Sequence, residues 1–165
     1  MTTRTLVILR HAKAASQEQS ADIDRPLTAR GHADAAAAGA WLSQHSYVLD
    51  LVLCSPARRA RETWHGVALA LERAPEVRYD DKVYNAAALE LLHLISDVED
   101  EIGTVLLVGH NPGVSQLSML LDADGADPSG LRTAGIAVHT SAAKWSEWGP
   151  RAAPLAASHT GRAGA

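Results

Sequence analysis

The sequence predicts an α/β protein: a three-layer sandwich with a mostly parallel central sheet, helices on both faces and an antiparallel edge. Three short segments, at residues 6–9, 50–55 and 104–108, have continuous apolar runs and lack the alternation of a half-exposed strand. Such runs are typical of strands that are covered on both faces. Segments with helical spacing or helix-start signals alternate with these runs, which is the pattern of a layered α/β fold.

Composition restricts the class of protein further. The chain has 165 residues, of which 47% are hydrophobic and 21% are charged, as in an ordinary single domain. A net charge of −4 argues against a general binder of nucleic acid or of membrane surfaces, so we expect neither as a partner. The single cysteine, Cys54, allows no intrachain disulfide. The apolar run near the N-terminus is too short for a signal sequence or a membrane span, and we expect a cytoplasmic protein.

The first half of the chain predicts two strand–helix units and a minor strand. After the first strand, residues 15–25 have the polar composition of a surface loop. Thr28 is the expected N-cap of an alanine-rich helix, and Gly31 in its first turn would permit close approach of another backbone. Ser55 is the expected cap of the next helix, with Pro56 at its first position and its end near residue 71. A minor strand is expected at residues 77–79.

The second half predicts two more helices and the antiparallel edge. An amphipathic helix is expected within residues 86–99, and another follows the third apolar strand at residues 114–121. A late strand at residues 135–139 is expected to pair with an edge segment at residues 144–148. We therefore expect one α/β domain over residues 1–149. The Ala/Pro/Gly/Ser-rich residues 150–165 are expected to form a loosely held tail.

Polar groups follow all three apolar strands. They are Arg10-His11, Ser55 with the nearby Arg58, Arg59 and Arg61, and Gly109-His110. In open α/β sheets the ligand crevice lies beyond the carboxyl ends of the strands, so these groups are expected to converge there. Guanidinium groups present a planar fork suited to phosphate, and a phosphoryl dianion offsets the repulsion among several cations. The sequence therefore predicts a phosphate pocket.

These motifs also resemble a known family. Arg10-His11-Ala12, the SPARRARET segment at residues 55–63 and the GHNPG segment at residues 109–113 occur in the order of the histidine phosphatase superfamily. The resemblance is closest to its small phosphohistidine phosphatase branch, the SixA-like proteins. Residues 24–31 and 83–86 are also similar to that branch, so the likeness spans about residues 5–148. Ala12 departs from the usual Arg-His-Gly triplet of the superfamily, although alanine is compatible with the small branch.

The resemblance implies four catalytic residues. His11 would be the nucleophile and Arg10 would bind phosphate, while Arg59 and His110 would complete the pocket. Adjacent helix positions differ by about 100°, so Arg58 and Arg59 cannot both face one ligand. The resemblance selects Arg59, the arginine that precedes Ala60. A neutral imidazole can attack phosphorus and form a phosphohistidine that water then hydrolyses. A protonated His110 could donate to a phosphoryl oxygen.

The expected activity is therefore that of a phosphatase with a covalent intermediate on His11. The leading substrate is phosphohistidine on a protein, such as a phosphohistidine-carrying signalling protein. One alternative is a phosphatase for a small phosphorylated metabolite. A phosphate-binding module without turnover is a second alternative, disfavoured because all four pocket residues are present. An assay with a generic aryl phosphate would separate the module from an enzyme.

Further residues have weaker assignments. Ser16 and Lys13 lie near the nucleophile in sequence and could line the rim, and Asn111 and Ser55 could contact phosphate. No carboxylate cluster accompanies the motifs and no third ligand joins His11 and His110, so neither a metal nor another cofactor is expected.

A general acid for the leaving group is not evident in the sequence. The middle segment at residues 84–88, where larger relatives carry an acid, has none before Glu90. Asp80, Asp81 or Glu90 would have to fold back into the crevice to protonate an alkoxide. Without such an acid we expect phosphohistidine and aryl phosphates to be hydrolysed well and alkyl phosphates poorly.

Overall fold

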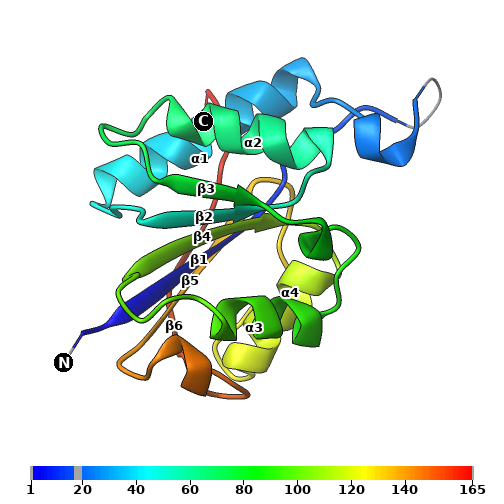
Figure 1. The fold of residues 1–165 in the computed structure, drawn as a ribbon. Helices are drawn as coiled ribbons and strands as arrows, with labels where there is room; N and C mark the ends of the chain where they lie inside the picture. Colours follow the sequence, from blue (N-terminus) through cyan, green and yellow to red (C-terminus); the bar gives the residue numbers. More distant parts are fainter. Residues whose placement is uncertain (1, 17–19, 165) are drawn as a thin grey trace.

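The centre of the computed structural model, which describes residues 2–16 and 20–164, is a mixed six-stranded sheet in the order β3-β2-β4-β1-β5-β6 (Figure 1). The first four strands in this order run parallel to one another, whereas β5 pairs antiparallel with β1 and β6 pairs antiparallel with β5. The strands are β1 (Arg4–Arg10), β2 (Leu51–Cys54), β3 (Glu76–Tyr79), β4 (Thr104–Gly109), β5 (Gly135–Ser141) and β6 (Leu155–Thr160).

Helices cover both faces of this sheet. Figure 1 shows α1 (Ala29–Gln44) and α2 (Arg58–Ala68) on one side, with α3 (Ala88–Ser96) and α4 (Gly113–Leu121) on the other. Three short 3-10 helices, η1 (Asp22–Asp24), η2 (Asp81–Val83) and η3 (Trp145–Glu147), lie in the connections. The predicted three-layer α/β fold with an antiparallel edge is thus confirmed.

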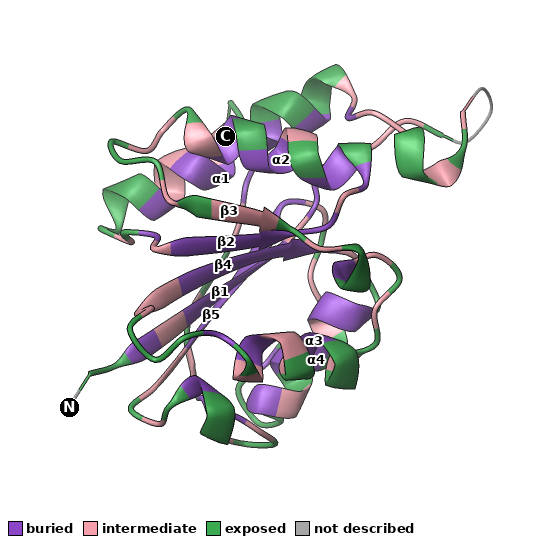
Figure 2. Cartoon of the chain, viewed as in Figure 1, coloured by how far each residue is buried: buried purple, intermediate pink, exposed green. Residues whose placement is uncertain are grey.

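The continuous apolar strands arise because the two layers of helices need apolar partners on opposite faces. In β1, Leu6 and Ile8 pack in the cluster beneath α3 and α4, whereas Val7 and Leu9 pack in the cluster beneath α1 and α2. All four side chains are fully buried, as are most positions of the central strands (Figure 2). Each such side chain contributes about 1.5–3 kcal/mol relative to an exposed one. This burial fixes the strand ends from which the polar motifs project.

The start of α1 follows the predicted pattern. The Thr28 hydroxyl accepts a hydrogen bond from the Gly31 N–H at 3.0 Å, as expected of an N-cap. A Cβ at position 31 would overlap the carbonyl oxygen of Lys13. The glycine is therefore required by the close approach of the chain just after His11, and the expectation of a close backbone contact is confirmed.

The start of α2 differs from the prediction by two residues. The helix begins at Arg58 with Ala57 as its N-cap, and no side chain caps it. The Ser55 hydroxyl does accept from the Ala57 N–H at 3.2 Å, but it does so within the turn that precedes the helix. This short turn leaves Ser55 next to the strand ends rather than on the helix.

The antiparallel edge is formed by a segment other than the one predicted. Residues 144–148 contain η3, whose Trp145 and Trp148 pack into the core beneath α3 and α4. The indole N–H groups of these two residues donate to the carbonyl oxygens of Ile102 and Ala143. Trp145 and Trp148 thus anchor a turn through their rings and N–H groups. β6, rather than residues 144–148, pairs with β5 at the edge of the sheet.

The expectation of a loosely held tail is wrong for most of residues 150–165. Leu155–Thr160 form β6, in which partly buried residues alternate with exposed ones. An edge strand needs only one buried face and a hydrogen-bonded neighbour, so small and polar residues suffice there. Beyond β6, Arg162 Nη1 donates to the Thr133 carbonyl at 2.8 Å and lies 3.4 Å from Asp34 Oδ2. Backbone pairing and this buried carboxylate hold the segment in place.

Within the described residues, no helix is both long enough and apolar enough to cross a membrane. The cytoplasmic location stays a prediction.

Candidate active site

The first and third predicted motifs meet because their strands are neighbours. β1 and β4 run parallel, with Arg10 opposite Gly109, so both strands end at the same edge of the sheet. The His11 N–H donates to the Gly109 carbonyl at 3.0 Å, which continues this pairing by one residue. The rings of His11 and His110 consequently lie side by side, with their centroids 5.1 Å apart.

The hydrogen bonding of His11 determines which of its nitrogens can react. Nδ1 lies 2.8 Å from the carbonyl oxygen of Ala12, which can only accept a hydrogen bond. Nδ1 therefore carries the proton, and Nε2 holds the lone pair. Burial, together with the nearby Arg59 and Arg10 charges, lowers the pKa of His11 to about 4. The ring is therefore neutral at pH 7, as a nucleophilic imidazole must be.

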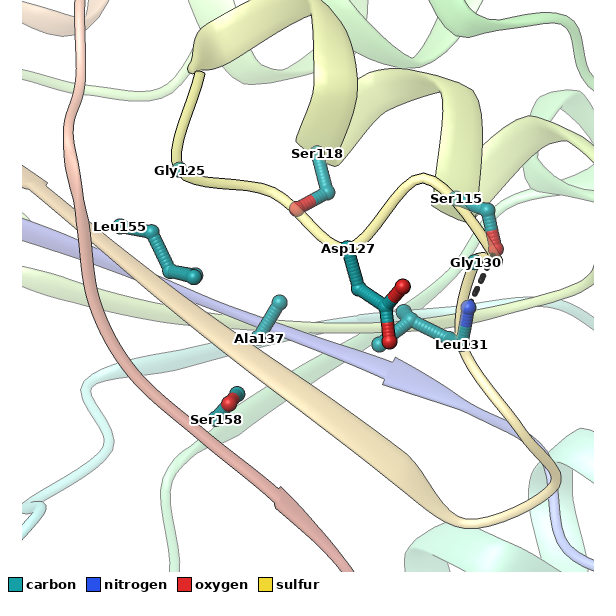
Figure 3. Close-up of a pocket in the computed structure, with 9 residues that line it drawn as sticks. All are labelled: Ser115, Ser118, Gly125, Asp127, Gly130, Leu131, Ala137, Leu155 and Ser158. Atoms are coloured by element: carbon teal, nitrogen blue, oxygen red, sulfur yellow. Dashed lines mark hydrogen bonds between the residues drawn. The ribbon is translucent and has the colours of Figure 1, made fainter. Parts of the chain in front are cut away.

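Arg10 is held in place by the loop that precedes β5. Its Nη1 donates to the Leu131 carbonyl at 3.2 Å, and the same oxygen accepts from Asn111 Nδ2 at 2.9 Å. The Leu131 N–H donates to Ser115 Oγ at 2.8 Å (Figure 3), and that hydroxyl donates to Asn111 Oδ1. This closed ring of hydrogen bonds fixes the carbonyl on which Arg10 rests.

Arg59 projects into the same site from the first turn of α2. Its side chain is only 6% exposed, whereas Arg58 is 49% exposed and pairs with Glu62. The Arg59 guanidinium donates to the Asp22 backbone carbonyl at 2.7 Å and to Asp22 Oδ2 at 3.1 Å. Its Cζ also lies 6.0 Å from the centroid of the Tyr84 ring. The structure therefore places Arg59 in the site and Arg58 outside it.

His110 is fixed by Ser55, the serine that begins the second predicted motif. Its Nε2 lies 2.7 Å from Ser55 Oγ, and Ser55 is fully buried. Burial, with the neighbouring His11 and Arg59, lowers the pKa of His110 to about 3. The protonated His110 expected from the sequence is thus a neutral ring in the substrate-free protein. A neutral imidazole can still donate through the nitrogen that carries its proton.

These residues line an open pocket of about 340 Å³ at the carboxyl ends of β1 and β4. Among its described lining residues the side chains of Arg10, Lys13, Arg25 and Arg59 are cationic, and Asp22 is the one acidic side chain. The remaining lining residues are His11, Ala14, Asn85, His110, Asn111 and Thr133. The pocket is therefore built for an anion.

Three nitrogens of the pocket are buried without a hydrogen-bond partner among the described residues. They are Nε of Arg10, Nε of Arg59 and Nδ1 of His110. Leaving a buried polar group unsatisfied costs about 1–3 kcal/mol, so such groups are rare outside functional sites. Oxygens of a bound phosphoryl group can accept from donors of this kind.

Two residues predicted to bind substrate have other surroundings. Ser16 is exposed and lies outside the described set of residues that line the pocket. Asn111 does line the pocket, but both ends of its amide are used in the ring that supports Arg10. Asn111 therefore supports Arg10 through one of the two hydrogens of its Nδ2, and its binding of substrate stays a prediction. Lys13 lines the rim, as considered from the sequence.

None of the three candidate general acids lines the pocket. Glu90 accepts from the Ala87 N–H at 3.0 Å in the first turn of α3. Asp80 caps η2 by accepting from the Lys82 N–H at 2.9 Å, and Asp81 is an exposed residue of that short helix. The roles of Glu90 and Asp80 at helix starts are common for acidic side chains and draw them away from the strand ends.

The sequence did not single out Asp22, which lines the pocket, or Tyr84, which contacts Asp22 and His110. Tyr84 OH donates to Asp22 Oδ2, and the Tyr84 ring packs edge-on against His110 at 5.6 Å between centroids. Asp22 belongs to the polar loop predicted at residues 15–25. The one signal in the sequence for its ion pair is its position three residues before Arg25. Arg25 Nε donates to Asp22 Oδ1 at 3.1 Å, an ion pair that this spacing allows. Only the fold brings this loop over Arg59.

Comparisons with known proteins agree with this geometry. Residues 6–84 match the family described as histidine phosphatase superfamily (branch 1). The chain is 38% identical to an uncharacterized protein of Mycobacterium tuberculosis, over 93% of this chain and 100% of that protein. It is 33% identical to a phosphohistidine phosphatase SixA homolog of Haemophilus influenzae, over 68% of this chain and 73% of that one.

A solved structure extends the likeness to the whole fold. A protein of Nakamurella multipartitia assigned as a phosphohistidine phosphatase SixA superposes with a TM-score of 0.85. It is 33% identical, and the match covers 98% of each chain. The strand-end motifs, the fold and these relatives agree, and the chain belongs to the histidine phosphatase superfamily, in its SixA-like branch.

Proposed function

We propose that this protein is a phosphohistidine phosphatase that transfers the phosphoryl group of its substrate to Nε2 of His11. The observation that carries the proposal is the hydrogen bond from Nδ1 of His11 to the Ala12 carbonyl, which directs the lone pair of a neutral ring to Nε2. The same bond would hold the proton of the phosphorylated ring, because Nδ1–H becomes more acidic when Nε2 carries phosphorus.

Phosphoryl transfer requires mainly positioning and stabilisation of charge on the equatorial oxygens. Arg10 and Arg59 are the proposed ligands of those oxygens, each with a buried Nε that lacks a protein partner among the described residues. His110 is proposed to add a donor through Nδ1. Asn111 and the Leu131 carbonyl would hold the Arg10 side chain in position.

The nature of the leaving group favours phosphohistidine over an alkyl phosphate. An alkoxide leaves poorly without a general acid, and such help is typically worth about 10² to 10⁴ in rate. The acidic side chain among the described lining residues is Asp22, whose pKa is lowered to about 2 by hydrogen bonds and nearby arginines, so it holds no proton to give. Phosphohistidine needs no such proton when its ring is already protonated on the other nitrogen.

The proposal is tested by trapping the intermediate. The protein is mixed with a protein substrate that carries labelled phosphohistidine, quenched, and digested to locate the label. We expect an acid-labile label on His11 and loss of turnover in His11→Ala. His32→Ala is the matched control, because His32 is 53% exposed and lies outside the described lining residues. Label on another residue, or substantial turnover by His11→Ala, would contradict the assignment.

A further inference from the structure

Asp22 is held at the pocket by contacts from three directions. Its Oδ2 accepts from Arg59 Nη2 at 3.1 Å and from the Tyr84 hydroxyl, while its Oδ1 accepts from Arg25 Nε at 3.1 Å. Its backbone carbonyl accepts from Arg59 Nη1 at 2.7 Å, so the backbone is also tied to the phosphate-binding arginine. The carboxylate therefore has a fixed position relative to the group that would bind phosphate.

Asp22 lies nearer the mouth of the pocket than the reacting ring does. His11 is 8% exposed and the Arg59 side chain 6%, whereas the Asp22 side chain is 33% exposed. In phosphoryl transfer the attacking and leaving atoms are roughly in line with phosphorus. A nucleophile at the floor of the pocket therefore directs the leaving group toward the mouth, where Asp22 and Arg25 lie.

The charge of Asp22 matches one class of leaving group. The hydrogen bond from Tyr84 and the adjacent Arg59 and Arg25 keep its pKa well below the usual range, so the carboxylate is ionised at every physiological pH. A fixed negative charge repels a departing phenolate or alkoxide and attracts a protonated imidazole. The attraction is electrostatic and needs no vacant position on the carboxylate.

We propose that Asp22 is a specificity-determining residue whose carboxylate attracts the cationic imidazole of phosphohistidine and so favours it over phosphate esters, whose leaving groups carry no positive charge. This inference rests on the proposed phosphohistidine phosphatase function. Attack by Nε2 of His11 forms a new N–P bond while the N–P bond of the substrate breaks. The electron pair of the broken bond returns to the substrate nitrogen, and the substrate leaves as neutral imidazole that keeps its N–H.

The transfer is then symmetric in charge. The phosphorylated and protonated ring belongs to the substrate before the transfer and to His11 after it. Asp22 acts on the incoming ring, and the Ala12 carbonyl acts on the ring of His11. Because the substrate ring carries its positive charge before attack and loses it afterwards, Asp22 stabilises the bound substrate at least as much as the transition state. Its effect is therefore expected mainly in KM rather than in kcat.

The experiment compares two substrates in variants of Asp22. Phosphoimidazole has a ring that can be protonated, and p-nitrophenyl phosphate has a leaving group that needs no proton. In Asp22→Asn we expect kcat/KM for phosphoimidazole to fall about 10- to 100-fold, the range for loss of a charge-assisted interaction. We expect kcat/KM for p-nitrophenyl phosphate to fall by much less, so that the ratio of the two values decreases. Asp22→Glu, which restores the charge, should restore much of the preference.

Asp24→Asn is the matched control, because Asp24 is an exposed residue of the same short helix and lies outside the described lining residues. Equal losses for both substrates in Asp22→Asn would overturn the inference, since they would mean that Asp22 only maintains the shape of the pocket. Unchanged kcat/KM for both substrates would overturn it as well. Neither result would affect the labelling of His11, so failure of this inference is distinguishable from failure of the proposed function.

Discussion

Ser55 Oγ lies 2.7 Å from Nε2 of His110, and the two residues directly follow the neighbouring strands β2 and β4. Because Ser55 Oγ already accepts from the Ala57 N–H, its own hydrogen can be donated to Nε2. The neutral ring would then carry its proton on Nδ1, the buried nitrogen without a partner in the described part of the chain. Ser55 is thereby suited to set the tautomer of His110.

Ser55→Ala is therefore expected to lower kcat/KM by at least about tenfold, toward the roughly 10²-fold cost of losing one transition-state donor. Ser118→Ala is the control, because Ser118 Oγ lies at the same 2.7 Å distance from Nε2 of the buried His139, which does not line the pocket. The two variants remove equivalent Ser–His bonds. Similar kcat/KM for both would show that Ser55 has no special part in the reaction.

The low pKa values of the two pocket histidines predict a specific response to acid. Both rings are neutral in the folded protein down to about pH 4 or below, whereas an unfolded chain takes up these protons near pH 6.5. Between these values the unfolded state binds more protons, so the free energy of unfolding should fall as pH decreases from about 6.5 toward 4. NMR titration of labelled imidazoles should show His11 and His110 midpoints well below 6.5. Midpoints near 6.5 would contradict the burial argument.

Arg59→Ala should reduce kcat/KM for an aryl phosphate by about 10²- to 10³-fold, the usual cost of losing a donor to developing charge. Arg58→Ala should change kcat/KM by less than about threefold, because exposed ion pairs such as the one between Arg58 and Glu62 contribute little. Circular dichroism would confirm that both variants are folded. Equal losses in the two variants would mean that the pocket arginine has been misassigned.

The contacts of Arg162 predict that the C-terminal segment contributes to the stability of the fold. It donates to the Thr133 carbonyl and pairs with Asp34, which is 3% exposed in its side chain. Arg162→Ala should lower the free energy of unfolding in urea by about 1–2 kcal/mol. Arg30 pairs with the same carboxylate but is 65% exposed, so Arg30→Ala should cost less than about 0.5 kcal/mol. The reverse order would show that the C-terminal segment contributes little.

We expect phosphatase activity to survive chelation of divalent metals and to be inhibited by vanadate, which mimics the five-coordinate phosphoryl group. The reason is the charge of the pocket, where four described cationic side chains surround one carboxylate that is itself paired with arginines. Activity assays with and without chelator would check this. Loss of activity on chelation and its return with a divalent metal would count against the proposed site.

The parts of the site that could be predicted from the sequence are those set by local pattern. The runs at residues 6–9 and 105–108 are apolar throughout, because buried parallel strands need apolar side chains on both faces. The polar groups that follow them must then project from one edge of the sheet. The helix period meant that only one of Arg58 and Arg59 could face this edge, and the resemblance to the family selected Arg59, which is the less exposed of the two.

Tertiary structure alone decided which distant segments meet at that edge. Asp22 and Arg59 are 37 residues apart, and only the packing of the η1 loop over α2 brings them together. After Leu155, β6 is composed of small and polar residues with no strand signal of their own, and it becomes ordered because β5 offers an unpaired edge and Asp34 binds Arg162. Local propensity sets the strands and caps of this protein. The part of the pocket around Asp22 and the last strand, β6, depend instead on contacts between distant segments. No single segment encodes such contacts.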